Sequence, residues 1–195
     1  MQDIILASQS PRRKLLLEWA EVPFEVIVKH TDETFPAGLS PAEVAVYIAR
    51  KKAVAVQEYV QSAFHAEMSG KRILAADTIV VLDETIIGKP EDREDAIRIL
   101  QSLSGKKHKV ITGVVILHRN GEIVFADTTE VSFHELSDTQ IEYYVDKYEP
   151  YDKAGAYAIQ EWIGVTGIQS INGDFYNVMG LPVSRVLQEL YKTNL

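Results

Sequence analysis

The feature that most constrains the fold is an apolar run at residues 73–82, which only Asp77 and Thr78 interrupt. The run does not alternate between apolar and polar residues, so it predicts a central β-strand that is covered on both faces. A buried carboxylate without a partner is costly, and Asp77 is therefore expected to face a cleft, a metal or a cation. The alternative is an aspartate that ends the strand and accepts hydrogen bonds from turn N–H groups.

Strand and helix patterns alternate along the chain. Apolar residues predict strands at 4–7, 24–28, 110–117 and 123–133, and the Asn120-Gly121 pair predicts a tight hairpin turn between the last two. Helices are predicted at 12–20, from the Ser40–Glu43 capping box to about residue 67, at 92–103, after Ser137 to about 147, and from Pro182 onward. These elements predict an α/β (mixed α+β) layered domain around a mixed sheet. No repeat or linker divides the chain, so a single domain over residues 1–195 is expected.

Charge and cysteine content narrow the class of function. The 195 residues contain 20 Lys and Arg against 28 Asp and Glu, a net charge of −8, which disfavours nonspecific binding to nucleic acid or to an anionic membrane. The chain has no cysteine, which excludes disulfides and thiolate chemistry and fits a reducing compartment. The apolar run at the N-terminus is far too short to span a bilayer, so a soluble, cytoplasmic protein is expected.

The first candidate site is the segment Ser8-Gln9-Ser10-Pro11-Arg12-Arg13, between a buried strand and a helix N-terminus. Free N–H groups, two hydroxyls and two guanidiniums together would hold an anion such as phosphate. The alternative is that Ser10 only caps the helix and that both arginines are solvated. The segment lacks the glycine pattern of a P-loop or a Rossmann turn.

Further candidates are separated in the sequence. Lys52 lies in the run Arg50-Lys51-Lys52, and such runs are more often a solvated helix face than a site. Lys89 lies in a Gly-Lys-Pro turn, and Glu33 lies in a polar loop. The glycine-bearing segment at 149–160 is typical of a binding loop, although a plain surface loop is nearly as compatible with its composition.

Other classes of site find no support in the sequence. The five histidines show no metal-ligand spacing, and neither H-E-x-x-H nor G-x-S-x-G occurs. The aromatic residues are dispersed and have no accompanying basic stripe, so a nucleic-acid platform is also poorly supported.

Taken together, several motifs resemble the Maf family of nucleotide pyrophosphatases over nearly the whole chain. They are LASQSPRR at 6–13, Asp32-Glu33, Ala49–Ala53, LAADTIV at 74–80, Gly88-Lys89-Pro90, LSGKKHKVITG at 103–113, EPYDKAGAYAIQ at 149–160 and INGDFYNVMGLP at 171–182. The resemblance implies hydrolysis of a nucleoside triphosphate between its α and β phosphates with a divalent metal, Mg²⁺ or Mn²⁺. It also implies a two-lobed fold around a long mixed sheet, similar to the inosine triphosphate pyrophosphatases, and a homodimer.

The resemblance further implies roles for individual residues. The position of Asp77 is that of the proton acceptor, and Arg12, Thr78 and Gln160 match positions that bear on the accepted base. The combination of these three residues is similar to that found in the branch of the family that acts on dTTP and UTP. Glu33, Lys52 and Lys89 match polar positions lining the same cleft. Ser8, Ser10 and Arg13 complete the expected substrate-binding set as members of the first motif.

Physical chemistry is compatible with these roles. A triphosphate carries close to four negative charges, and Arg12, Arg13, Lys52 and Lys89 together with a metal would neutralise them. Aspartate is a weak base toward water, so a metal must acidify or position the water while Asp77 accepts the proton or ligates the metal. Sequence leaves both roles of Asp77 open.

Three hypotheses follow. The first is an enzyme that removes noncanonical or excess pyrimidine triphosphates by releasing pyrophosphate. The second is a nucleotide-binding regulator of septum formation or cell division in which hydrolysis is secondary. The third is a general phosphatase that releases orthophosphate. The enzyme hypotheses require that residues from remote parts of the chain converge around one polyphosphate.

Overall fold

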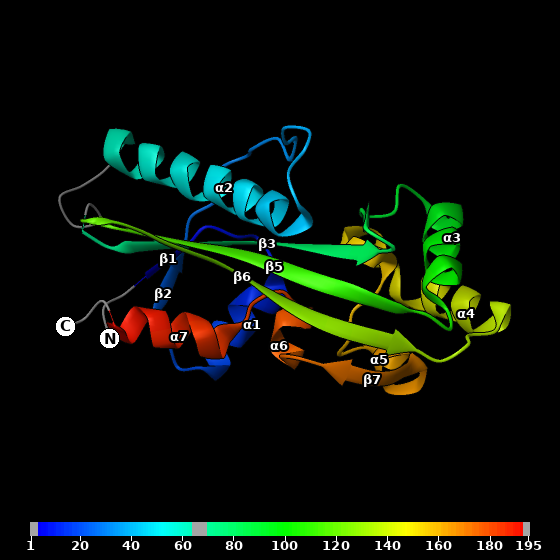
Figure 1. The fold of residues 1–195 in the computed structure, drawn as a ribbon. Coiled ribbons are helices and arrows are strands. Elements are labelled where there is room, and N and C mark those ends of the chain that lie inside the picture. The colour runs from blue at the N-terminus through cyan, green and yellow to red at the C-terminus, as the bar shows by residue number, and fades with distance from the viewer. Residues whose placement is uncertain (1–3, 64–69, 193–195) are drawn as a thin grey trace. The chain divides into compact units, whose positions relative to one another are not determined.

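The computed structural model describes residues 4–63 and 70–192, which form a mixed α/β structure with a seven-stranded sheet (Figure 1). The strand order is β2-β1-β3-β5-β6-β7, and β4 pairs with β3. The strands are β1 (Ile4–Leu6), β2 (Phe24–Val26), β3 (Arg72–Leu82), β4 (Thr85–Ile87), β5 (Lys107–His118), β6 (Gly121–Phe133) and β7 (Ile168–Asn172). β1 runs parallel to β2 and β3, whereas β4 and β7 pair antiparallel with β3 and β6. The predicted mixed sheet is therefore confirmed.

The helices mostly begin where their caps predict. They are α1 (Pro11–Trp19), α2 (Pro41–Ala63), α3 (Arg93–Leu103), α4 (Asp138–Tyr148), α5 (Trp162–Gly167), α6 (Phe175–Met179) and α7 (Val183–Lys192), with 3₁₀ turns η1 (Pro150–Asp152) and η2 (Ala154–Ala156). Ser40 and Glu43 form the predicted capping box, and so do Ser137 and Gln140. The expected continuation of α2 to about residue 67 lies outside the described residues. No helix in the described ranges has the length and apolarity needed to cross a membrane.

The chain divides into two compact units. Unit 1 contains the residues up to Asp77, Thr112–Asp127 and the residues from Gly180 onward, and unit 2 contains Thr78–Ile111 and Thr128–Met179. β3, β5 and β6 each contribute residues to both units. This division agrees with the two-lobed expectation, whereas the assignment of a single domain to residues 1–195 stays a prediction.

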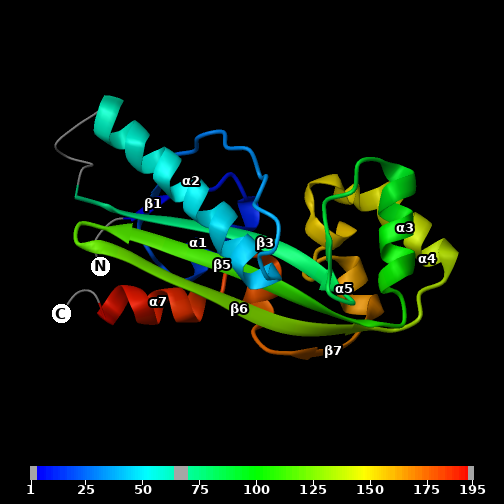
Figure 2. The ribbon, with the colours of Figure 1, turned by 45° about the horizontal axis from the view of Figure 1, so that its top comes forward.

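In unit 1, α2 covers one face of the sheet and α7 lies on the other (Figures 1 and 2). Alternate residues of β3, Ile73 and Ala75, pack with Val56 and Val60 of α2, because successive strand side chains point to opposite faces. A Cβ atom at Gly113 of β5 would lie 2.3 Å from the Val46 backbone nitrogen. The absence of a side chain at this glycine therefore lets α2 lie directly on the sheet.

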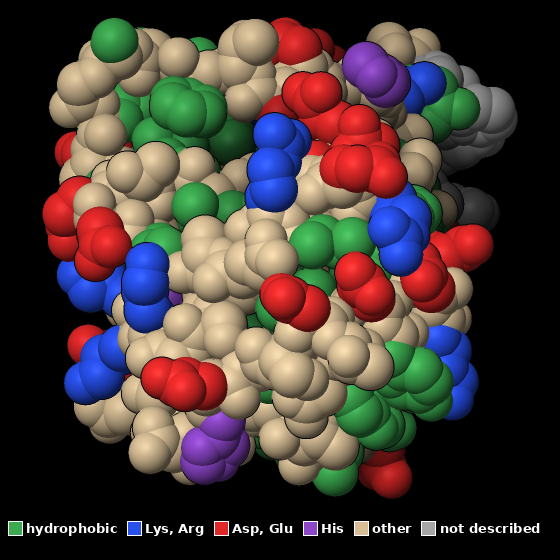
Figure 3. All heavy atoms as spheres, turned by 90° about the vertical axis from the view of Figure 1, so that its right-hand side faces the viewer, with side chains coloured by type: hydrophobic (Ala, Val, Ile, Leu, Met, Phe, Trp, Pro, Cys, Tyr) green, Lys and Arg blue, Asp and Glu red, His purple; other side chains and the backbone are tan. Residues whose placement is uncertain are grey.

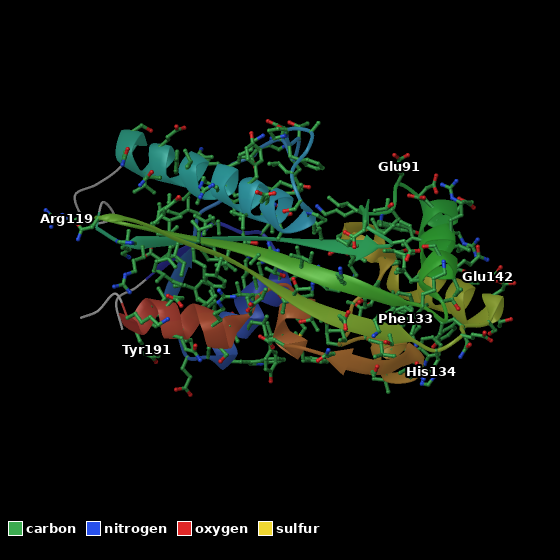
Figure 4. All side chains as sticks on the ribbon, viewed as in Figure 1. Glu91, Arg119, Phe133, His134, Glu142 and Tyr191 are labelled. Atoms are coloured by element: carbon green, nitrogen blue, oxygen red, sulfur yellow. The ribbon has the colours of Figure 1, made fainter. Side chains whose placement is uncertain are left out.

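In unit 2, α3 packs against α4, and the guanidinium of Arg93 donates two hydrogen bonds to Asp146 across their exposed surface. Acidic and basic side chains lie next to one another over the face that carries these helices (Figure 3). The interior contains His108, Phe133 and Tyr157, whose rings meet edge to face. Phe133 is labelled at the end of β6 in Figure 4, and its ring centroid lies 5.2 Å from His108 and 5.0 Å from Tyr157.

Candidate active site

Asp77 lies in the middle of β3 and contacts a cation. Lys52 of α2 donates hydrogen bonds from Nζ to Asp77 Oδ1 at 2.6 Å and to Glu33 Oε1 at 2.9 Å. The Asp77 side chain is only 13% exposed and that of Lys52 19%, so this ion pair is largely shielded from water. The expectation that Asp77 faces a cation is confirmed, and the alternative of a strand-ending aspartate is wrong because β3 continues to Leu82.

The position of Lys52 follows from the small residues beside it. Ala49 and Ala53 are completely buried against the sheet, so α2 lies close to β3 and Lys52 reaches Asp77 instead of solvent. The neighbouring Lys51 instead bonds Asp32 at 2.6 Å. The interpretation of the basic run as a solvated helix face therefore fails for Lys52. Tertiary packing, which sequence spacing could not reveal, joins Glu33, Lys52 and Asp77.

Side-chain hydrogen bonds fix the segment that precedes α1. Ser10 caps the helix by accepting a hydrogen bond from the Arg13 N–H at 3.4 Å, as predicted. Arg13 is buried, and its guanidinium donates to Ser8 Oγ at 3.1 Å and to the Gly180 carbonyl at 2.8 Å. The alternative that both arginines are solvated is therefore wrong for Arg13. No local signal in the sequence predicts Gly180 as the partner of Arg13, although the glycine lies in the INGDFYNVMGLP motif.

Electrostatics connect these two groups within unit 1. Burial lowers the pKa of Arg13, and the positive charge of Arg12 lowers it further, whereas the negative charges of Asp77 and Glu33 act in the opposite direction. Arg12 is half-buried and Ser10 is also partly exposed. Unit 1 therefore brings the Ser8–Arg13 segment and the Glu33–Lys52–Asp77 cluster into one charged neighbourhood.

The remaining predicted residues, Thr78, Lys89 and Gln160, belong to unit 2. Lys89 and Gln160 are exposed, and Thr78 is half-buried. The Gly155 N–H donates to the Gly88 carbonyl at 3.1 Å, which holds the segment containing Gln160 against the turn containing Lys89. Gly155 has φ +71°, and an added Cβ would lie 2.8 Å from Val80 Cγ2 of β3, two residues beyond Thr78. Convergence of these residues with the cluster of unit 1 stays a prediction.

Comparison with known proteins identifies the family. A family model described as Maf-like protein matches residues 3–193, and the chain belongs to this family. A protein of Bacteroides thetaiotaomicron named dTTP/UTP pyrophosphatase is 48% identical over 190 residues, which cover 97% of this chain and 95% of that protein. A protein of Bacillus cereus strain AH187 with the same name is 46% identical over 195 residues, covering 100% and 97% of the two chains. The resemblance drawn from the motifs is thereby confirmed.

One solved structure also aligns with the chain. The structure of the Staphylococcus aureus Ham1 protein has a TM-score of 0.42 and 14% sequence identity, and the alignment covers 68% of this chain and 72% of that one.

Proposed function

We propose that this protein hydrolyses dTTP and UTP to the nucleoside monophosphate and pyrophosphate. The observation that carries the proposal is the cluster of Glu33, Lys52 and Asp77 in unit 1, where two carboxylates share one ammonium group and the Lys52–Asp77 pair is shielded from water. Relatives named for this activity, 46–48% identical over nearly the whole chain, support the same reaction.

Binding of the triphosphate would depend on local positive charge, because the chain as a whole carries a net charge of −8. Arg12 and Lys89 are accessible cations, and Lys52 can exchange a carboxylate for a phosphate oxygen. The N–H groups at the start of α1 and the hydroxyl of Ser10 add neutral donors. Buried Arg13 holds Ser8 and thereby shapes this segment. These donors would also stabilise the charge that develops on the departing pyrophosphate.

The donor set of unit 1 fits a divalent cation. The described residues contain no group of three metal-ligating side chains. Mg²⁺ needs only one or two carboxylates when water and substrate phosphates complete its shell, and Glu33 and Asp77 supply two that already contact a common positive charge. We therefore propose that Glu33 is the protein ligand of Mg²⁺ or Mn²⁺ and that water and phosphate oxygens complete its shell, which leaves Asp77 to accept a proton. When bound, the ion would acidify a water molecule and offset phosphate charge.

Asp77 would accept the proton of the attacking water. The water oxygen forms a bond to the α-phosphorus while the bond from that phosphorus to the α–β bridging oxygen breaks, and the bridging oxygen leaves with pyrophosphate. Lys52 already donates to Oδ1 of Asp77, so we assign the proton to Oδ2. Lys52 orients the carboxylate by this bond, since an ion pair shielded from water holds its geometry.

Base recognition would use unit 2. The hydroxyl of Thr78 and the amide of Gln160 can pair with the donor and acceptor groups on the edge of a uracil or thymine ring. A site built on such pairs rejects analogues that leave one partner unmatched by up to about 10⁴-fold. This selectivity would limit the reaction to triphosphates whose base presents the edge of uracil or thymine, including noncanonical ones.

The location, partners and oligomeric state of the protein are also part of the proposal. We propose a cytoplasmic protein, which its lack of cysteine fits, with no nucleic-acid or membrane partner, because its net charge of −8 repels polyanions. We also propose a homodimer on the family resemblance, which sedimentation of the purified protein would test.

A nucleotide panel tests the function. Purified protein is incubated with each nucleoside triphosphate and Mg²⁺, and both products are identified by chromatography. We expect pyrophosphate and monophosphate from dTTP and UTP, and no turnover by Asp77→Asn. Asp32→Asn, a substitution of the exposed neighbour that bonds Lys51, is the matched control and should retain activity. Orthophosphate release would identify a phosphatase, and tight binding without product would instead favour a nucleotide-binding regulator.

A further inference from the structure

One buried hydroxyl holds both ends of the turn that contains Gln160. Tyr144 of α4 is completely buried, and its oxygen accepts a hydrogen bond from the Ala158 N–H at 3.1 Å while its O–H donates to the carboxylate of Glu161. The Glu161 N–H in turn donates to the Ala158 carbonyl at 3.1 Å. Residues 158–161 thus form a tight turn that is closed by its own backbone bond and clamped by a side chain from another element. Gln160 lies inside this turn with its side chain exposed.

A second contact anchors the carboxylate of Glu161. Lys153 follows η1, its side chain is only 9% exposed, and its Nζ lies 3.7 Å from Glu161 Oε1 and 2.8 Å from Asp152 Oδ1. The Glu161 carboxylate therefore contacts a phenolic hydroxyl on one oxygen and faces an ammonium group on the other. Charge-assisted bonds of this kind are shorter and stronger than neutral ones. The turn is consequently fixed by Tyr144 of α4 and by Lys153, the residue after η1, together.

We infer that Tyr144 and Glu161 are positioning residues that set the base preference by fixing the backbone of Gln160. This inference rests on the proposed function of Gln160 in base recognition. A carboxamide carries both a donor and an acceptor, so its orientation decides which base edge it matches. Uracil and thymine present an acceptor at O4 and a donor at N3, whereas cytosine presents a donor at N4 and an acceptor at N3. A mobile Gln160 could satisfy either edge, and a fixed one discriminates between them.

Tyr144→Phe tests the inference because it removes one oxygen and preserves the ring. Tyr148→Phe is the matched control, since Tyr148 lies on the same helix and stacks on Tyr144 with a centroid distance of 5.0 Å. The kcat and KM values for dTTP and dCTP are measured for both variants. We expect the ratio of kcat/KM for dTTP to that for dCTP to fall about tenfold or more in Tyr144→Phe, since misplacement of a recognising group by about 1 Å can cost 10²-fold. The ratio should be unchanged in Tyr148→Phe.

Glu161→Gln and Glu161→Ala separate the two contacts of the carboxylate. Glu161→Gln keeps an acceptor for the Tyr144 hydroxyl, whereas Glu161→Ala does not. The ratio of kcat/KM for dTTP to that for dCTP should therefore stay closer to the wild-type value in Glu161→Gln than in Glu161→Ala. A merely structural role would lower the melting temperature of Tyr144→Phe and leave the dTTP to dCTP ratio unchanged, and that result would overturn the inference.

Hydrogen exchange tests the clamp without reference to catalysis. The amides of the peptide covering residues 157–162 should exchange faster in Tyr144→Phe than in the wild type or Tyr148→Phe, because the Ala158 N–H loses its acceptor. Unchanged exchange would refute the clamp. If wild-type protein releases no pyrophosphate from dTTP, the proposed function fails on that result alone, and the exchange still decides whether Tyr144 fixes the turn.

Discussion

The shielded ion pair at the centre of the candidate site makes a quantitative prediction for Lys52→Met. The substitution keeps an unbranched apolar stem but removes the ammonium group that Asp77 contacts at 2.6 Å. Two unit charges at this separation attract by about 6 kcal/mol at an effective dielectric constant of 20, and the cost of desolvating both groups offsets part of that attraction. Removing one partner of a buried pair costs about 3–5 kcal/mol, because the other charge is left without compensation. The 19% exposure of Lys52 places our expectation near the lower end, at about 3 kcal/mol.

Urea denaturation followed by circular dichroism measures this loss as a fall in the free energy of unfolding. The double variant Lys52→Met/Asp77→Asn should recover most of the loss, since it removes the uncompensated charge. Lys51→Met is the matched control, because Lys51 is the adjacent residue and bonds the exposed Asp32, and its midpoint should hardly move. If Lys52→Met costs less than about 1 kcal/mol, or if the double variant recovers nothing, the pair does not hold Asp77 as described.

Two further predictions concern the interior of unit 2. Burial lowers the pKa of His108 to about 4 from the ordinary value of about 6.5, so the folded protein resists protonation that the unfolded chain accepts. The free energy of unfolding should therefore fall by about 3 kcal/mol through this residue as the pH falls from 6.5 to 4. In denaturation experiments over this pH range, His108→Gln should show a correspondingly shallower fall. An equal pH dependence of stability in the variant and the wild type would contradict the prediction. Gly155→Ala should destabilise the fold by about 2 kcal/mol through backbone strain and the contact with Val80. Gly38 also has a positive φ, but an added Cβ there would meet no atom within 4 Å, so Gly38→Ala should cost less stability in the same assay. Equal losses of stability in the two variants would show that the contact with Val80 does not contribute.

Much of the fold could be predicted because local signals agreed with packing. The continuous apolar run became the central strand β3, and serine caps began α1 and α4 as expected. The sequence predicts no element over residues 161–181, because the elements there depend on their partners. β7 has mostly exposed residues and takes its register from β6, with an irregularity at Ser132 and Phe133. In the glycine-containing helix α5, a Cβ at Gly164 would lie 1.7 Å from the Ile159 carbonyl oxygen, a close approach that periodicity does not reveal.

The candidate site was predictable only as separate motifs. An acid in an apolar strand requires a partner, but the identity of that partner depends on how far α2 approaches the sheet, which Gly113 and the buried Ala49 and Ala53 decide. The hydrogen bonds that fix the turn around Gln160 had only a weak signal in the sequence. That signal is Lys153, which lies among small residues and is buried in the structure. Tyr144 carried no local signal, since a tyrosine on a helix face is ordinarily part of the core.

In the proposed reaction, water attacks the α-phosphorus of dTTP or UTP with Asp77 as proton acceptor. Hydrolysis of dTTP in ¹⁸O-labelled water, followed by mass spectrometry of both products, shows which phosphorus is attacked. We predict one labelled oxygen in dTMP, unlabelled pyrophosphate, and no labelled product above background with Asp77→Asn. Label in pyrophosphate or in orthophosphate would place the attack at another phosphorus and contradict the account.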